Sequence, residues 1–183
     1  MPHPKFDYLF TCFDRDRSGR LDVNDFFALG RTLRVASGWA ELDPRNLRIS
    51  RALDAFWEVM LISVDADGSG DVDRDEFRIF EQLMADAANA PGEPAPPWVL
   101  ELYAAIFEAL DADEDGRINL QEYTTYLSAA GSHMDPAAAF AKLDLDGSGF
   151  LEVDELELLL TRYFTTTDPD DPANYMLTGG WPT

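Results

Sequence analysis

Four twelve-residue segments of this chain repeat one arrangement of acidic, glycine and aliphatic residues, and this repetition constrains the fold more than any other feature. The segments are residues 14–25, 65–76, 111–122 and 144–155. Each has oxygen-bearing side chains at positions 1, 3 and 5, glycine at 6, an aliphatic residue at 8 and a carboxylate at 12. Glycine at position 6 permits a sharp turn that penalises a β-carbon. Apolar residues at helical spacing flank each segment, so the sequence predicts an all-α chain of four helix–loop–helix units.

The side chains of the four loops predict metal binding. Calcium takes six to eight oxygen ligands, and a twelve-residue loop can supply them from positions 1, 3 and 5, from the backbone carbonyl of position 7 and from a bidentate carboxylate at 12. The candidate metal ligands are Asp14, Asp16, Ser18, Arg20, Asp25, Asp65, Asp67, Ser69, Asp71, Glu76, Asp111, Asp113, Asp115, Arg117, Glu122, Asp144, Asp146, Ser148, Phe150 and Glu155. We therefore expect up to four bound Ca²⁺ ions.

The first loop departs from the pattern because its position 12 is Asp25, whereas the other three loops have glutamate there. Aspartate is one methylene shorter, so bidentate contact with the ion is harder unless the loop contracts. We predict either weaker calcium binding in this loop or a tighter six-coordinate site. Mg²⁺, which prefers octahedral geometry, would compete for such a site.

The aliphatic residues at position 8 predict how the loops pair. They are Leu21, Val72, Ile118 and Leu151, each between hydrophilic neighbours. Paired loops of this kind form a short two-stranded ladder that buries one aliphatic side chain from each loop. We expect Leu21 to face Val72 and Ile118 to face Leu151.

The charge of the chain is consistent with this interpretation. The sequence has 35 Asp and Glu against 14 Lys and Arg, which gives a formal net charge of −21. Self-repulsion on this scale destabilises a compact state unless something neutralises it. The acids form four clusters rather than one acidic tail, and no basic patch suited to phosphate contacts is visible, so nucleic acid is not an expected partner.

The spacing of the loops predicts two pairs. An N-terminal pair spans residues 1–89 and a C-terminal pair spans 98–164, with a proline-rich linker at 90–97 that breaks the helix between them. The tail at 165–183 is polar and rich in proline but ends with apolar residues, so it either frays or docks on the body. The long connection inside the first pair is predicted to contain two extended helices around a turn, with Asp43 as a helix cap.

Several features indicate the setting of the chain. Cys12 is the single cysteine, so no intramolecular disulfide can form, and its place in an aromatic-rich helical segment predicts a small buried hydrophobe. No signal-peptide run and no window of transmembrane length is present. We expect a soluble cytoplasmic monomer that binds no membrane.

The loops and their spacing resemble those of the EF-hand superfamily, and the whole chain is similar to the calerythrin and sarcoplasmic calcium-binding proteins. Length, two pairs of loops, the long connection in the first pair and the apolar tail carry the resemblance. It implies a compact all-α fold whose halves pack face to face around an aromatic core. Members of this family often have one degenerate loop, whereas all four loops here retain their ligands. The arginine and alanine bias would suit a prokaryotic, actinobacterial member.

Three functions compete at this point. The first is intracellular calcium buffering or transport, favoured because the methionines are scattered and the twelve phenylalanines suggest a firmly packed interior. The second is a calcium sensor that exposes an apolar groove to a target protein. The third is an enzyme or a calcium-triggered photoprotein, which would need histidines lining a chromophore cavity. Only His3 and His133 are present, and no catalytic motif is found, so we expect no enzymatic activity.

Overall fold

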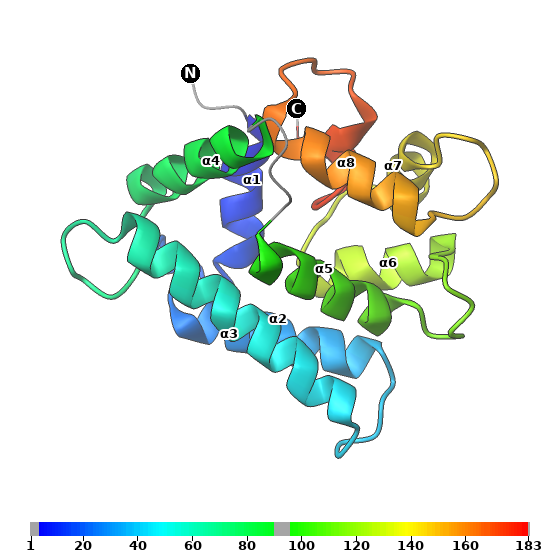
Figure 1. The fold of residues 1–183 in the computed structure, drawn as a ribbon, viewed down its shortest axis with the longest axis horizontal. Coiled ribbons are helices and arrows are strands. Elements are labelled where there is room, and N and C mark those ends of the chain that lie inside the picture. Colours follow the sequence, from blue (N-terminus) through cyan, green and yellow to red (C-terminus); the bar gives the residue numbers. More distant parts are fainter. Residues whose placement is uncertain (1–3, 90–95, 183) are drawn as a thin grey trace.

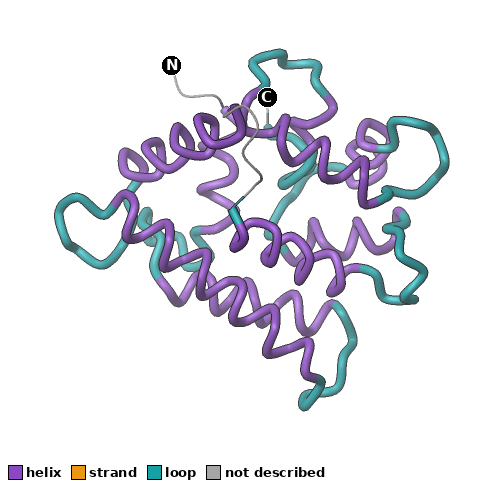
Figure 2. Tube along the Cα trace, viewed as in Figure 1, coloured by secondary structure: helices purple, strands orange, loops and turns teal. Residues whose placement is uncertain are grey.

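The computed structural model describes residues 4–89 and 96–182, and eight α-helices account for most of this part of the chain (Figures 1 and 2). A short 3₁₀ helix, η1, follows the last of them. The helices are α1 (Pro4–Phe13), α2 (Val23–Ala36), α3 (Pro44–Val64), α4 (Arg74–Asn89), α5 (Pro97–Leu110), α6 (Leu120–Ala129), α7 (Pro136–Leu143), α8 (Val153–Thr165) and η1 (Pro172–Tyr175). The predicted all-α fold of four helix–loop–helix units is confirmed.

Helix starts are fixed by capping side chains in the sequence. Asp43 accepts a hydrogen bond from the Arg45 backbone N–H at 2.9 Å, and Pro44 occupies the first turn of α3. Asp135 caps α7 in the same way. A side-chain oxygen satisfies one of the otherwise unpaired N–H groups of a first turn, and proline there loses no helical hydrogen bond. The connection between the first two loops accordingly forms two helices, α2 and α3, as predicted.

The eight helices form two halves, α1–α4 with the first two loops and α5–α8 with the last two. The halves pack together mainly through α3 against α5, α2 against α5 and α6, and α4 against α8 (Figure 1). Aromatic rings fill much of the N-terminal half and reach the interface, where Phe56 lies 5.8 Å from Trp98 between ring centroids. The first loop pair and the second are therefore joined through one continuous hydrophobic core.

The tail docks on the body, which settles the alternative that the sequence left open. Ala173, Asn174 and Thr178 are fully buried. The Tyr123 hydroxyl donates to the Tyr175 carbonyl at 2.8 Å, so the tail is attached to α6. The Asn174 side chain also accepts a hydrogen bond from Lys5, which joins the tail to α1.

Lys5 is an unexpected buried cation near the start of α1. Its side chain is 1% exposed, and Nζ donates to the Tyr163 carbonyl and, at 3.1 Å, to Asn174 Oδ1. The ammonium also lies over the rings of Phe6 and Tyr163. Burial lowers the pKa of Lys5 to about 8, because desolvation disfavours the charged form.

The segment between the two halves was predicted to be a proline-rich linker. The predicted linker 90–97 lies mostly outside the described residues, and its last residue, Pro97, already begins α5.

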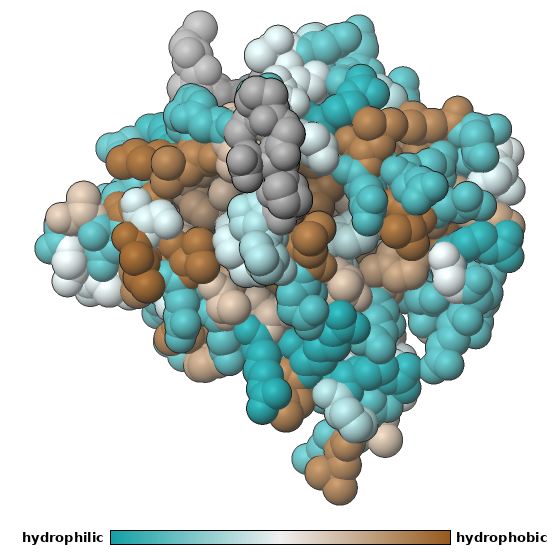
Figure 3. All heavy atoms as spheres, in the orientation of Figure 1, coloured by the Kyte–Doolittle hydropathy of each residue, from teal (hydrophilic) through white to brown (hydrophobic). Residues whose placement is uncertain are grey.

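No helix in the described ranges is long and apolar enough to cross a membrane. Hydrophobic side chains do reach the surface over α4 and α8 (Figure 3), and Ile79 and Leu158 are each about half exposed.

Candidate metal centres

Each predicted loop brings three carboxylates to one point. In every loop, one oxygen each from positions 1, 3 and 12 lie within 4.8 Å of one another. The groups are Asp14, Asp16 and Asp25; Asp65, Asp67 and Glu76; Asp111, Asp113 and Glu122; and Asp144, Asp146 and Glu155. Calcium–oxygen distances are about 2.3–2.6 Å, so two ligands of one ion lie at most about 5 Å apart. All four clusters therefore have the dimensions of a calcium site.

Glycine at position 6 adopts the left-handed conformation that the sequence predicted. The four glycines have φ between 81° and 82°. Position 4 is left-handed too, and there the residues are Arg17, Gly68, Glu114 and Gly147, with φ from 59° to 73°. Sequence reasoning missed position 4, although glycine in two of the four loops was the available signal. The two non-glycine residues adopt a conformation that L-residues rarely adopt, so the loop fold imposes it on them.

Backbone N–H groups orient the position 1 and position 3 carboxylates. In the first loop, the two oxygens of Asp14 accept from the N–H groups of Ser18 and Gly19, both at 2.9 Å. Asp16 also accepts from Ser18 N–H, at 2.9 Å. The other three loops repeat these bonds with the equivalent residues. The loop backbone thus holds the carboxylates in place by charge-assisted hydrogen bonds.

Position 12 closes each loop onto its own beginning. The two oxygens of Glu76 accept from the N–H groups of Ala66 at 3.1 Å and Asp73 at 3.0 Å, which are loop positions 2 and 9. Asp25 makes the same two contacts, with Arg15 at 2.8 Å and Asp22 at 2.9 Å. The shorter aspartate therefore reaches both anchoring groups. Burial raises the pKa of Asp25.

Position 7 links the loops within each pair. Arg20 of the first loop forms an ion pair with Asp71, which occupies position 7 of the second loop. In the C-terminal half, the Arg117 guanidinium lies 3.9 Å from the centroid of the Phe150 ring, again at position 7 of both loops. The carbonyls of these residues were predicted as ligands, and the structure gives their side chains a second role in pairing.

Position 8 joins the same loops through backbone hydrogen bonds. Leu21 and Val72 exchange N–H···O bonds of 2.8 and 2.9 Å, and Ile118 and Leu151 exchange bonds of 3.0 and 2.8 Å. All four side chains are at most 1% exposed. The predicted partners are correct. Among the described residues each pair is joined by one isolated antiparallel bridge, so the predicted short two-stranded ladder is not confirmed.

These features define a class of protein, in which paired twelve-residue loops between helices each gather carboxylates around one point. The family described as "EF hand" matches residues 60–80, 102–128 and 137–160, and the family described as "EF-hand domain pair" matches residues 3–30. The chain belongs to the EF-hand family. It binds Ca²⁺ through its acidic loops, of which up to four have the carboxylates for an ion.

Two individual proteins are similar to this chain over most of its length. Aequorin-2 from Aequorea victoria is 38% identical over 167 residues, which cover 88% of this chain and 82% of that protein. Calexcitin-1 from Caenorhabditis elegans is 23% identical over 178 residues, covering 94% and 83%. Both similarities extend over most of the two chains rather than over one motif.

Solved structures share the whole fold. A calcium-binding protein of Streptomyces coelicolor, described in connection with prokaryotic calcium-mediated regulation, is 26% identical and covers 88% of this chain and 96% of its own, with a TM-score of 0.74. A sarcoplasmic calcium-binding protein from amphioxus is 21% identical and covers 95% and 94%, with a TM-score of 0.71. The resemblance to sarcoplasmic calcium-binding proteins is thereby confirmed at the level of the fold.

Proposed function

We propose that this protein is a calcium buffer that holds its ions in a body that opens little. One observation carries the proposal. The apolar faces of the two EF-hand pairs cover each other, and the docked tail covers part of the C-terminal pair. A sensor of the groove-exposing type has to free such a face for its target when calcium binds. Here that exposure would break the contact between α3 and α5 and the attachment of the tail.

We assign the ligands of each ion as the sequence pattern suggested. Side-chain oxygens come from positions 1, 3 and 5, a carbonyl from position 7 and two oxygens from position 12. Support comes from the spacing of the carboxylates and from position 5, where the Ser18 hydroxyl donates to the Arg20 carbonyl at 2.8 Å. Both groups therefore point toward one place. In the third loop position 5 is Asp115, which is paired with Arg117 at 2.9 Å.

The proposal includes a cytoplasmic monomer without enzymatic activity, built from the pairs at 1–89 and 98–164. The carboxylate pairs, which in another setting would suggest acid–base catalysis, belong to the candidate metal clusters of the loops. Of the two histidines, His133 is exposed and His3 lies outside the described residues. Two solved structures of similar fold are photoproteins. We do not propose that function here, because the described residues that line the apolar space between the two halves include no histidine.

The test compares compactness with and without calcium. Small-angle scattering and binding of an apolar fluorescent dye are measured on the full chain in excess calcium and in chelator. A buffer is expected to be most compact and least dye-accessible with calcium bound. An increase in dye binding on adding calcium would instead identify a sensor.

The sensor remains the second candidate because of one comparison. The Streptomyces coelicolor calcium-binding protein, described in connection with prokaryotic calcium-mediated regulation, shares 26% identity and the fold with this chain. If this chain regulates a target, a partner should be retained by the calcium-loaded protein and released in chelator. The dye experiment separates the two functions even when no target is known.

A further inference from the structure

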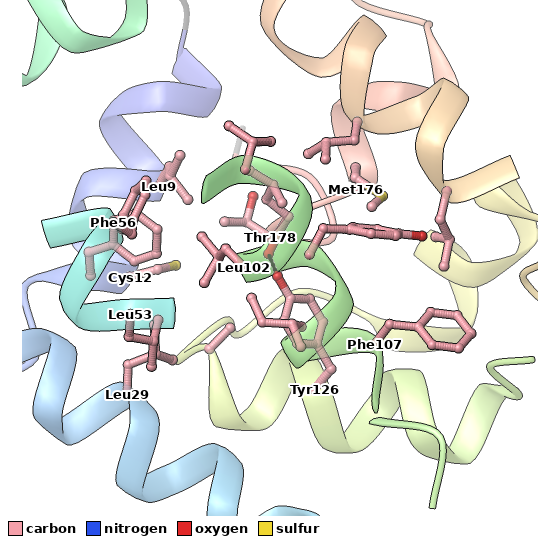
Figure 4. A pocket seen from close by; sticks show the side chains of 18 of the residues that line it. Leu9, Cys12, Leu29, Leu53, Phe56, Leu102, Phe107, Tyr126, Met176 and Thr178 are labelled. Carbon is pink, nitrogen blue, oxygen red and sulfur yellow. Dashed lines mark hydrogen bonds between the residues drawn. The ribbon is translucent and has the colours of Figure 1, made fainter. Parts of the chain in front are cut away.

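An apolar cavity of about 160 Å³ lies between the two halves, around α5 (Figure 4). Leu9, Leu53 and Phe56 approach it from the N-terminal half, and Phe107 and Met176 approach it from the C-terminal half and the tail, with Leu102 of α5 between them. The α5 helix contributes more to this wall than to the fully buried core, where it supplies only Ala105 and Ala109. The large apolar side chains of α5 thus line this space.

The polar groups of the cavity wall are mostly bonded elsewhere. The hydroxyls of Tyr123 and Tyr126 donate to carbonyls of the tail at 2.8 and 3.1 Å, and the Thr178 hydroxyl donates to the Gly180 carbonyl at 2.8 Å. The described lining residues include no lysine, arginine or histidine, so an anionic ligand would find no positive partner. Among these described residues, Glu81 is the one carboxylate, and the buried Tyr103 hydroxyl has no hydrogen-bond partner. The wall therefore suits a neutral, apolar occupant.

The size of the cavity sets the size of that occupant. An engineered cavity of about 150 Å³ lined by Leu, Ile and Phe in another protein stays dry and binds benzene. A void of this kind leaves its lining atoms without contact partners on one side, and an apolar molecule of matching volume restores those contacts. The volume here corresponds to a single aromatic ring.

The cavity wall is also connected to every metal loop. The residue that follows the position 12 acid lines the cavity in all four cases: Phe26, Phe77, Tyr123 and Leu156. In each loop the position 12 carboxylate belongs to the candidate metal cluster, and the very next side chain lines the cavity. A shift of the position 12 carboxylate on metal binding would therefore be passed to the cavity wall at four places.

We propose that this cavity binds one neutral apolar molecule of the size of a single aromatic ring, and that this ligand and calcium bind cooperatively. The proposal goes beyond buffering and rests on calcium binding by the four loops. Calcium binding draws the loop carboxylates together and thereby fixes the wall, so the defined cavity belongs to the calcium-loaded protein. Coupling between two sites is reciprocal, so the ligand raises calcium affinity by the same factor by which calcium raises ligand affinity.

Benzene is the probe for the binding test. Isothermal titration of the calcium-saturated full chain is expected to show one saturable site. Leu102→Phe places extra volume in the cavity and is expected to weaken benzene binding at least tenfold. The matched control is Leu100→Phe, the same change on the same helix at a half-exposed residue outside the cavity wall. Absence of benzene binding to the wild type, or equal affinity in the two variants, would overturn the proposal.

A second variant guards against misfolding of the first. Leu102→Ala enlarges the cavity, so it is expected to bind indole more tightly than the wild type does. An unchanged indole affinity in folded Leu102→Ala protein would contradict the assignment of this site.

The coupling is tested by titrating calcium with and without saturating benzene and by repeating the benzene titration in chelator. Benzene is expected to raise calcium affinity and to bind poorly without calcium. Equal benzene affinity in calcium and in chelator would overturn the coupling. The calcium titration in the absence of benzene reports the loops alone, so a failure of calcium binding is seen separately from a failure of the cavity site.

Discussion

At the scale of single residues, position 12 is the ligand position that sets the first loop apart, because it is Asp25 there and glutamate in the other three loops. Asp25 reaches the same two backbone N–H groups as Glu76 does, although its side chain is one methylene shorter. We infer that the first loop closes more tightly around its shorter position 12 side chain than the second loop does. A contracted loop favours the smaller ion, because Mg²⁺ needs oxygens at about 2.0–2.1 Å whereas Ca²⁺ takes them at about 2.3–2.6 Å.

The first prediction concerns this residue. Asp25→Glu is expected to raise calcium affinity of the first loop about tenfold, equivalent to about 1.4 kcal/mol, and to reduce competition by magnesium. The matched control is Glu76→Asp, the reverse change in the second loop, which is expected to weaken calcium binding there. Isothermal titration with calcium, at several magnesium concentrations, measures both. Unchanged calcium and magnesium affinities in Asp25→Glu would show that the side-chain length at position 12 does not matter.

Glu81 of α4 gives a second residue-scale prediction. Burial, followed by the charge of Asp7, raises the pKa of Glu81 to about 7, while Arg78 and Lys5 lower it. The native state then holds this proton more tightly than the unfolded chain, whose reference value is 4.5. The contribution of Glu81 to stability is present at low pH and is lost as the pH rises to about 7.

Glu81→Gln removes this titration. The free energy of unfolding of the variant minus that of the wild type is expected to increase as the pH rises from 5 to 7 and then to level off. Denaturant unfolding in excess calcium measures it at each pH. Glu58→Gln, at an exposed position of α3, makes the same chemical change in solvent and serves as control. A difference for Glu81→Gln that does not vary with pH would contradict the prediction.

At the scale of elements, the loops were predictable and the tail was not. All ligands of one loop come from twelve consecutive residues, so spacing alone locates Asp65 and Glu76 at one site. The helix caps at Asp43 and Asp135 are local in the same way. Docking of the tail depends on residues far apart in the sequence, such as Tyr123 with Tyr175 and Lys5 with Asn174. No local pattern marks Lys5 as buried, because its partners are carbonyls and an amide from the other end of the chain.

The tail yields the third prediction. Removal of residues 166–183 takes away the buried Asn174 and Thr178, one side of the cavity wall and the acceptor for Tyr123. The truncated protein is expected to bind an apolar dye even with calcium present and to melt at a lower temperature. Calcium titration is expected to show that all four loops still bind, because no predicted ligand lies in the tail.

A single substitution separates the effect of one tail contact from the effect of removing the whole tail. Tyr123→Phe removes only the hydrogen bond to the Tyr175 carbonyl, so it is expected to cost about 1 kcal/mol of unfolding free energy. Dye binding by this variant should stay low in calcium. If truncation leaves both melting temperature and dye binding unchanged, the docked tail contributes nothing to the body.

At the scale of the whole molecule, the pairing of the loops could be predicted from the sequence, whereas the cavity between the two halves could not. Apolar residues at helical spacing identify which helix faces are buried. They do not specify whether the facing side chains fill the space between the helices. Leu102 and Phe107 of α5 are apolar residues whose pattern in the sequence is that of ordinary core. Only the arrangement of both halves around α5 reveals the space that they leave.

Net charge gives the last prediction. The chain carries a formal charge of −21, and four divalent ions add eight positive charges and bring it to −13. The loop carboxylates repel one another within 4.8 Å until an ion neutralises them. We therefore expect a loosely ordered protein in chelator and a cooperative fold in calcium. Each loop filled at one hundred times its Kd adds about 2.7 kcal/mol, and about 1 kcal/mol corresponds to about 2–4 °C in melting temperature for a chain of this length.

The effect of salt on melting temperature tests whether charge repulsion is what lowers the stability of the metal-free protein. Monovalent salt screens exposed charges, with a Debye length of about 10 Å at 0.1 M and about 3 Å at 1 M. Raising potassium chloride from 0.1 to 1 M in chelator is expected to raise the melting temperature measured by circular dichroism, whereas the calcium-loaded protein should change much less. Because the acids are concentrated in the loops, neutralising them by Asp65→Asn and Asp144→Asn should reproduce part of the effect of salt. A metal-free protein that melts at the same temperature at both salt concentrations would show that packing, rather than charge, limits its stability.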